Sequence, residues 1–219
     1  MSRATGISAS SCFNLLKTLT HERLVQFNVH TKTYSLGLGL LEISSHMRKL
    51  DRAELVRPEL ERVGSEYGAL MALWDITEER RMVLTDRVST DAAVRIELRT
   101  GLRLPALAGA IGRCVASMLK LSPAEMRKEF NRLVWQDDTD FEQYQREVLE
   151  AEARGYAIDR GSWANGINVV GVAIADASGA PRMGIGALTL SGQLSEPRLK
   201  ELGEELAGCA SSFSRIWFA

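Results

Sequence analysis

The stretch SASSCFNLLKTLTHERLVQFNVHTKTYSLG, residues 8–37, joins a helical pattern directly to a hairpin pattern. Ser8 or Ser10 can cap a helix by accepting a hydrogen bond from a backbone amide. Apolar residues then recur at helical spacing, which predicts a helix over about residues 9–22. Alternating apolar residues follow on both sides of a turn near His30–Lys32, which predicts a two-stranded hairpin.

The charges divide the chain at about residue 50. Residues 1–50 contain six basic and two acidic residues, a net charge of +4, whereas the remainder contains 21 basic and 26 acidic residues, a net charge of −5. The whole chain has a net charge of −1. A basic terminal unit suggests a polyanionic partner, and nucleic acid is the simplest one. The alternative is that so small an excess arose by chance.

A helix followed by a hairpin is the back half of a winged helix-turn-helix. Short polar side chains at the N-terminal end of such a helix fit the major groove of DNA, and a hairpin tip can reach a phosphate. The candidate DNA-binding residues are Ser8, Ser10, Ser11, Asn14, Lys17 and Lys32. A capped helix beside a hairpin also occurs in small domains of other function, so this reading competes with a purely structural one.

The rest of the chain predicts an α+β fold in which strands alternate with helices. Helices are expected over residues 38–50, from Arg57-Pro58 to 67, and over 107–119, 140–154 and 196–217, with a short one beginning at Pro123. Strands are expected over residues 69–75, 81–88, 94–98, 156–159, 169–176 and 184–190, in a central antiparallel sheet. We therefore expect a partial winged helix-turn-helix over 1–37, a linker helix over 38–51 and a larger domain over 52–219.

Several function classes do not fit the composition. No apolar stretch approaches the ~18–20 residues of a membrane span and the N-terminus lacks a signal-peptide core, so we expect a cytoplasmic protein. The three cysteines lack CxxC spacing, and all three histidines lie in the first fifty residues. We therefore expect no metal, no cofactor and no enzymatic activity. An enzyme would depend on Asp159 with Arg160, or on Cys114.

The N-terminal segment resembles the DNA-binding part of the IclR family of bacterial transcriptional regulators. The matching motifs are TGI at 5–7, LL at 15–16, TL at 18–19 and YSLG at 34–37. Asn14 stands where the family usually has arginine. About four residues precede Thr5, where the family has a first helix and most of a second, so Phe13, Leu16 and Leu19 are expected to lose apolar cover.

The resemblance continues through RPEL at 57–60, GLRLP at 101–105 with 108–113, GYA at 155–157 with Asp159, and TLSG at 189–192. Arg113 replaces the family's usual lysine and Leu107 its usual histidine. The resemblance implies a GAF/PAS-like effector-binding domain that takes a small organic molecule. Carried over by motif, the pocket residues are Ala110, Ile111, Asp159, Ile167, Val169, Thr189 and Ser191.

The resemblance implies a carboxylic or aromatic acid as the ligand, and the chemistry of these positions is compatible with one. Free amides at the start of a helix near Ala110 can hold a carboxylate, and Thr189 and Ser191, two apart on a strand, would face one side. Trp74 and Trp163 could flank an aromatic ring. The alternatives are that Asp159 only caps the turn before Gly161 and that Ile167 and Val169 are core residues.

The leading hypothesis is therefore a ligand-responsive transcriptional regulator. It would bind double-stranded DNA and a small organic acid, form a homodimer or tetramer, and have no membrane partner. The second hypothesis is a ligand-binding sensor module whose winged helix-turn-helix does not bind DNA because the first helix is absent.

Overall fold

A computed structural model describes residues 5–40, 52–136 and 138–218. The chain divides into two compact units, Met1–Asp51 and Arg52–Ala219.

The first unit contains one helix and one hairpin. Helix α2 spans Ala9–His21, and strands β1 (Val25–Asn28) and β2 (Thr33–Leu36) pair antiparallel. The Ser8 hydroxyl caps α2 by accepting a hydrogen bond from the Ser11 amide at 3.2 Å. The helix and hairpin predicted from the sequence are thus confirmed, whereas the helix predicted over 38–50 lies almost wholly outside the described residues.

The second unit is built on a six-stranded sheet of order β5-β4-β3-β8-β7-β6, in which every neighbouring pair is antiparallel. Its strands are β3 (Leu70–Ile76), β4 (Arg81–Val88), β5 (Arg103–Pro105), β6 (Ala157–Arg160), β7 (Ile167–Ala175) and β8 (Pro181–Leu190). The predicted α+β class with a central antiparallel sheet is confirmed.

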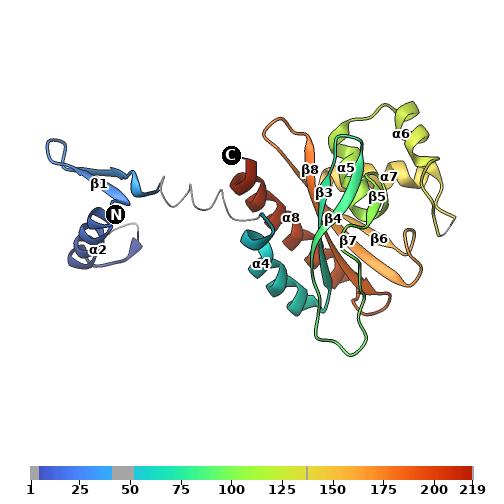
Figure 1. Ribbon diagram of the computed structural model, residues 1–219, viewed down its shortest axis with the longest axis horizontal. Helices are drawn as coiled ribbons and strands as arrows, with labels where there is room; N and C mark the ends of the chain where they lie inside the picture. The colour runs from blue at the N-terminus through green and yellow to red at the C-terminus, as the bar shows by residue number, and fades with distance from the viewer. Residues whose placement is uncertain (1–4, 41–51, 137, 219) are drawn as a thin grey trace. The chain divides into compact units, whose positions relative to one another are not determined.

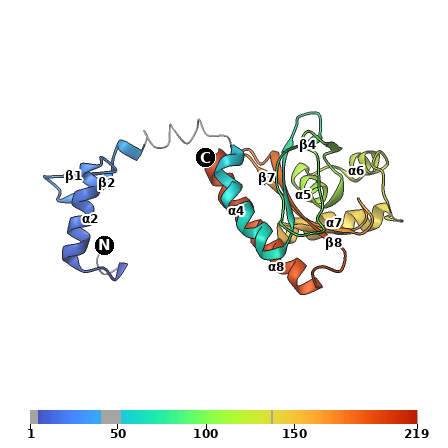
Figure 2. The same ribbon diagram turned by 60° about the horizontal axis from the view of Figure 1, so that its bottom comes forward.

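Helices cover both faces of this sheet (Figures 1 and 2). Helices α4 (Arg52–Tyr67) and α8 (Glu196–Phe218) cover one face, while α5 (Gly109–Leu119) and α7 (Phe141–Arg154) lie on the other side, next to the short α6 (Pro123–Phe130). Successive side chains of a strand point to opposite faces. Val170 and Val172 therefore join the core under α4 and α8, whereas Val169 and Ala173 join the core under α5.

The strand predicted over 94–98 is wrong. This segment is not part of the sheet: it begins in a bend at residues 93–94 and continues without regular structure, and Val94 is 74% exposed. The outer edge of β4 is instead paired with the residues that follow segment 94–98. The Leu84 amide donates to the Leu102 carbonyl, and the Gly101 amide donates to the Leu84 carbonyl. The alternation of Val94, Ile96 and Leu98 reflects packing of Ile96 and Leu98 on the core rather than sheet pairing.

The helix expected to open at Arg57-Pro58 begins earlier, at Arg52, and Pro58 lies inside it. Its buried face starts before the proline, with Val56, Leu60 and Val63 at helical spacing. Burial of this face compensates for the backbone hydrogen bond that proline cannot donate.

None of the described helices is both long and apolar enough to cross a membrane. The described residues also contain no group of three or more His, Cys, Asp or Glu side chains placed to hold a metal ion.

Burial of Cys114 predicts an alkaline loss of stability. Burial raises the pKa of this thiol from 9.0 to about 12, so above pH 9 the unfolded chain releases the proton before the folded chain does. The free energy of unfolding should then fall as the pH rises between these two pKa values, by about 1.4 kcal/mol in total from pH 8 to pH 10. Urea midpoints measured between pH 8 and 10 test this, and Cys114→Ala should have a shallower pH slope. An unchanged slope in that variant would assign the effect to other groups.

Candidate functional site

A small apolar cavity lies in the second unit, between the N-terminal end of α5 and the sheet. It is lined by Trp74, Met82, Leu104, Ala108, Gly109, Ala110, Ile111, Trp163, Val169, Gly186 and Leu188. Its free volume is about 30 Å³, far below the ~300 Å³ or more of a typical ligand cleft. The lining is thus apolar and includes two indoles.

Glycines allow the first turn of α5 to lie directly on the sheet. A Cβ atom on Gly171 would come within 2.6 Å of the Ile111 amide nitrogen, and one on Gly184 within 2.6 Å of Ile111 Cγ2. Both positions are central in their strands, where glycine costs stability unless another group approaches the backbone closely. The glycines of β7 and β8 therefore place the start of α5 at the cavity.

The start of α5 leaves backbone amides open. Its N-cap, Ala108, has no side chain that could accept a hydrogen bond, and the Ala108 carbonyl receives its bond from the Gly112 amide. Among residues 52–136 and 138–218, no acceptor is seen for the amides of Gly109 and Ala110. Unpaired amides and the helix dipole together favour an anionic group at this point.

Asp159 does not face this cavity with a free carboxylate. It is 1% exposed, and its Oδ1 accepts from the amides of Gly161 (3.1 Å) and Trp163 (3.2 Å). Its Oδ2 accepts from the Arg113 guanidinium at 2.9 Å and from the Ser162 hydroxyl. Both oxygens are thus occupied by protein donors, and Asp159 caps the turn at Gly161.

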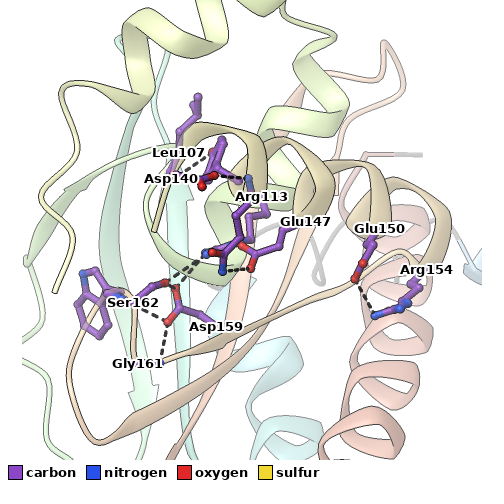
Figure 3. A network of polar contacts seen from close by, with 12 residues as sticks. Leu107, Arg113, Asp140, Glu147, Glu150, Arg154, Asp159, Gly161 and Ser162 are labelled. Atoms are coloured by element: carbon purple, nitrogen blue, oxygen red, sulfur yellow. Dashed lines mark hydrogen bonds and ion pairs between the residues drawn. The ribbon is translucent and has the colours of Figure 1, made fainter. Parts of the chain in front are cut away.

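Arg113 is the centre of this buried network (Figure 3). It is 1% exposed and donates to Glu147 and Ser162 as well as to Asp159. Its guanidinium carbon lies 5.7 Å from the ring centre of Trp135 and 5.6 Å from that of Tyr144. Burial by itself would lower the pKa of Arg113, but the carboxylates of Asp159 and Glu147 outweigh burial and raise it.

The structure brings together some of the expected pocket residues and separates others. Ala110, Ile111 and Val169 line the cavity, and Ile167 packs on the same core. Thr189 lies opposite Asn168 in the pairing of β8 with β7. The next pair along these strands is Val169 with Leu188, and both of those residues line the cavity. Because side chains alternate between faces, Thr189 faces away from the cavity.

Ser191 is not on the strand as expected, because β8 ends at Leu190. Its hydroxyl donates to the Asn168 side-chain oxygen at 3.3 Å. The Thr189 hydroxyl is buried without a hydrogen-bond partner among the described residues. Thr189 and Ser191 therefore lie near Asn168 and not beside Ala110.

Replacing Thr189 with valine should stabilise the protein. The side chains are nearly isosteric, and a buried hydroxyl without a partner costs about 1–3 kcal/mol. We expect Thr189→Val to raise the free energy of unfolding by about 1 kcal/mol in urea titrations. Destabilisation, or weaker ligand binding in this variant, would show instead that the hydroxyl has a partner that the structure lacks.

The sequence pattern missed Met82, Leu104 and Leu188 as lining residues. The alternation along β8 could have shown that Leu188 and Thr189 face opposite ways, but the register against β7 decides which one shares a face with Val169. That register depends on tertiary pairing. Trp74 and Trp163, considered from the sequence as possible flanks of a ligand, both line the cavity.

Asp159, Arg160 and Cys114, on which an enzyme would depend, all form hydrogen bonds or ion pairs with other protein groups. Arg160 forms a two-point ion pair with Glu196, with contacts of 2.9 and 2.7 Å. The buried Cys114 thiol donates to the Gly171 carbonyl, and its raised pKa disfavours the nucleophilic thiolate.

The first unit presents the polar residues expected to meet DNA. On α2, Cys12 is buried and Leu16 and Leu19 are partly buried, so these three define the inward side of the helix. Ser10, Asn14 and Lys17 are exposed and share the opposite side at i, i+4 and i+7 spacing. The Ser8 hydroxyl lies 2.9 Å from the Ser11 hydroxyl and 3.1 Å from the Ser10 hydroxyl.

The hairpin tip is held by a side chain at its start. The Asn28 side-chain oxygen accepts from the amides of His30 and Thr31, at 2.9 and 3.1 Å. Lys32 follows in the left-handed region, with φ of 56°, and is exposed. The tip thus presents Lys32 on an ordered turn.

The second unit is thus an α+β domain with an apolar cavity, and the first unit is a capped helix followed by a hairpin. The model of the family described as bacterial transcriptional regulator IclR C-terminal matches residues 45–215. The chain belongs to the IclR family.

Curated relatives and solved structures agree with this assignment. The regulator XynR of Escherichia coli is 24% identical over 98% of this chain and 86% of its own length. KipR of Bacillus subtilis is 23% identical over 96% of this chain and 85% of its own length. A putative regulator from Rhodococcus sp. RHA1 has a TM-score of 0.73 at 21% identity, covering 98% of this chain and 87% of that one. The repressor BlcR of Agobacterium tumefaciens has a TM-score of 0.63 at 25% identity, covering 98% and 86%.

Proposed function

We propose that this protein is a cytoplasmic, dimeric or tetrameric regulator that binds promoter DNA through its first unit and a small aromatic carboxylic acid through its second. The observation that carries the ligand class is the combination of open amides at Gly109 and Ala110 with an otherwise apolar lining. A carboxylate satisfies those amides, and an apolar ring suits the walls around them.

The two indoles favour an aromatic ring over a short aliphatic chain. Trp74 belongs to β3 and Trp163 to the loop after β6, and both line the cavity. Aromatic pairs gain about 0.5–1.5 kcal/mol beyond the burial of their area. A ring bearing several hydroxyls would leave them unpaired against this lining, and each unpaired group costs affinity.

The proposed DNA contacts divide into two kinds. Ser10, Ser11 and Asn14 are short polar side chains of the type that reads base edges, with Ser8 at the helix cap, whereas Lys17 and Lys32 suit phosphates. Replacing a lysine should weaken binding to all sequences, whereas Asn14→Ala should mainly reduce the preference for the cognate sequence.

Fluorescence anisotropy with DNA from upstream of the protein's own gene tests the proposed function. We expect the affinity to exceed that for a scrambled duplex and to fall at least about tenfold between about 50 and 200 mM salt. Calorimetry should show that benzoate binds more tightly than benzyl alcohol, which lacks the anion, or acetate, which lacks the ring. Benzoate should then change the DNA affinity by linkage. Equal affinity for benzoate and benzyl alcohol would contradict the carboxylate site.

One observation supports the alternative that the protein is a ligand-binding sensor whose first unit does not bind DNA. Phe13 is 60% exposed and Leu15 49% exposed on α2, beside the polar residues proposed to meet DNA. Of the three residues expected to lose apolar cover, Phe13 is exposed, whereas Leu16 and Leu19 are partly buried. The exposed apolar side chains of α2 are what favours this alternative. Benzoate binding without DNA binding at low salt would favour this alternative.

A further inference from the structure

Two features of the Trp163 wall distinguish it from the rest of the cavity lining. Apart from Ala108, which adjoins α5, Trp163 is the only lining residue outside a helix or strand. It lies between Gly161 and Gly166, whose φ angles of 94° and 79° are readily adopted only by glycine. The free volume is about 30 Å³, so the position of each wall decides whether a ring fits. This loop is the wall that regular structure constrains least.

The loop that carries Trp163 is fixed by hydrogen bonds to one side chain, that of Asp159. Asp159 Oδ1 accepts from the amides of Gly161 and Trp163, so it fixes the backbone on both sides of Ser162. Asp159 Oδ2 is bound by Arg113 and by the Ser162 hydroxyl. Four donors thus converge on one buried carboxylate, and three of them belong to the loop.

The other end of this connection is on α5. Arg113 lies one helical turn beyond Gly109 and Ala110, whose open amides adjoin the cavity. A Cβ atom added to Gly109 would lie 3.7 Å from Trp163 Cβ. The helix end and the indole therefore meet at the cavity, and the Arg113–Asp159 ion pair joins α5 to β6, the strand that leads into this loop.

We propose that Asp159 is a positioning residue: its carboxylate fixes the Trp163 indole as one wall of the cavity and so sets which aromatic ligands fit, without touching the ligand. The proposal deepens the proposed function and rests on its ligand site. It assigns to this chain a role for Asp159 different from the direct ligand contact expected from the sequence.

A double-mutant cycle on the full chain tests the coupling, with benzoate as the probe and calorimetry as the measurement. Asp159→Asn should weaken benzoate binding about tenfold in the wild-type background and less than about twofold in the Trp163→Ala background. Direct contact predicts the same fold-change in both backgrounds, and stronger benzoate binding on removal of the negative charge would also contradict positioning. Arg160 is an exposed neighbour of Asp159, so Arg160→Ala should leave the benzoate affinity unchanged in both the wild-type and the Trp163→Ala background.

A second measurement is independent of any ligand. The four tryptophans can be labelled with 5-fluorotryptophan, and the Trp163 fluorine signal assigned from its loss in Trp163→Phe. Asp159→Asn should shift or broaden the Trp163 signal and leave that of Trp217, at the end of α8, unchanged. An unaltered Trp163 signal in Asp159→Ala, which removes both acceptor oxygens, would overturn the proposal.

Ser162→Ala is the milder variant if Asp159→Asn does not fold. It removes one donor to Asp159 and should move the Trp163 signal in the same direction. Failure of benzoate to bind the wild type would contradict the proposed ligand class, while the fluorine signals would still decide whether Asp159 holds Trp163.

Discussion

Arg113→Met should destabilise the second unit by about 3–5 kcal/mol, one of the two largest losses we expect from any single substitution in this chain. The reason is the carboxylate that it leaves behind. Asp159 is 1% exposed, and removing one partner of a buried ion pair leaves an uncompensated charge in a medium that solvates it poorly. Contacts with the rings of Trp135 and Tyr144 are lost as well.

Arg160→Ala is the matched control for this prediction. Arg160 also forms a two-point ion pair, with Glu196, but the two side chains are 50% and 57% exposed. Such a pair is solvated when broken and contributes about 0–1 kcal/mol. All four tryptophans lie in the second unit, so urea unfolding followed by their fluorescence reports on this unit alone. Similar losses in the two variants would show that burial does not control the strength of these pairs.

The double variant Arg113→Met with Asp159→Asn adds a further check. Removing both charges relieves the buried, unpaired carboxylate, so the double variant should be less destabilised than the sum of the single variants. Additive losses would mean that Arg113 stabilises the fold through packing rather than through its charge.

The sequence predicted the elements of regular structure well where local signals and the hydrophobic period agree. The capped helix α2, the hairpin after it and the strand β4 all fall where expected. The segment 94–98 failed because its apolar alternation is satisfied by packing Ile96 and Leu98 on the core, while the edge of β4 is already paired. Alternation records which side chains are buried, and it does not record which backbone is paired.

The cavity was only partly predictable for a related reason. Ala110, Ile111 and Val169 were expected from motifs, and they line the cavity. Thr189 was expected there too, but the register of β7 against β8 turns it to the other face. The network around Arg113 joins residues 46 and 34 positions apart in the sequence, and no local pattern indicates such a contact.

Gly112→Ala should be the second severe substitution, although alanine is the better helix former. An added Cβ atom would lie 2.0 Å from the Leu107 carbonyl carbon and 2.3 Å from its oxygen. Those are backbone atoms, which cannot rotate away as a side chain can. The Leu107 carbonyl also accepts a hydrogen bond from the Tyr144 hydroxyl at 3.0 Å, so moving Leu107 would also disturb the contact between α5 and α7.

Gly208→Ala, in α8, separates this steric effect from helix propensity. Gly208 is exposed, and a Cβ atom there would meet nothing within 4 Å, so alanine should stabilise the unit by about 0.5–1 kcal/mol. Gly112→Ala should instead destabilise it by about 3 kcal/mol or more, since overpacking against fixed atoms costs at least 1–3 kcal/mol. Because the start of α5 adjoins the cavity, benzoate affinity should fall in Gly112→Ala and stay unchanged in Gly208→Ala. Opposite signs in the two variants, measured by the same urea titration, would show that close approach of the Leu107 backbone requires glycine at residue 112.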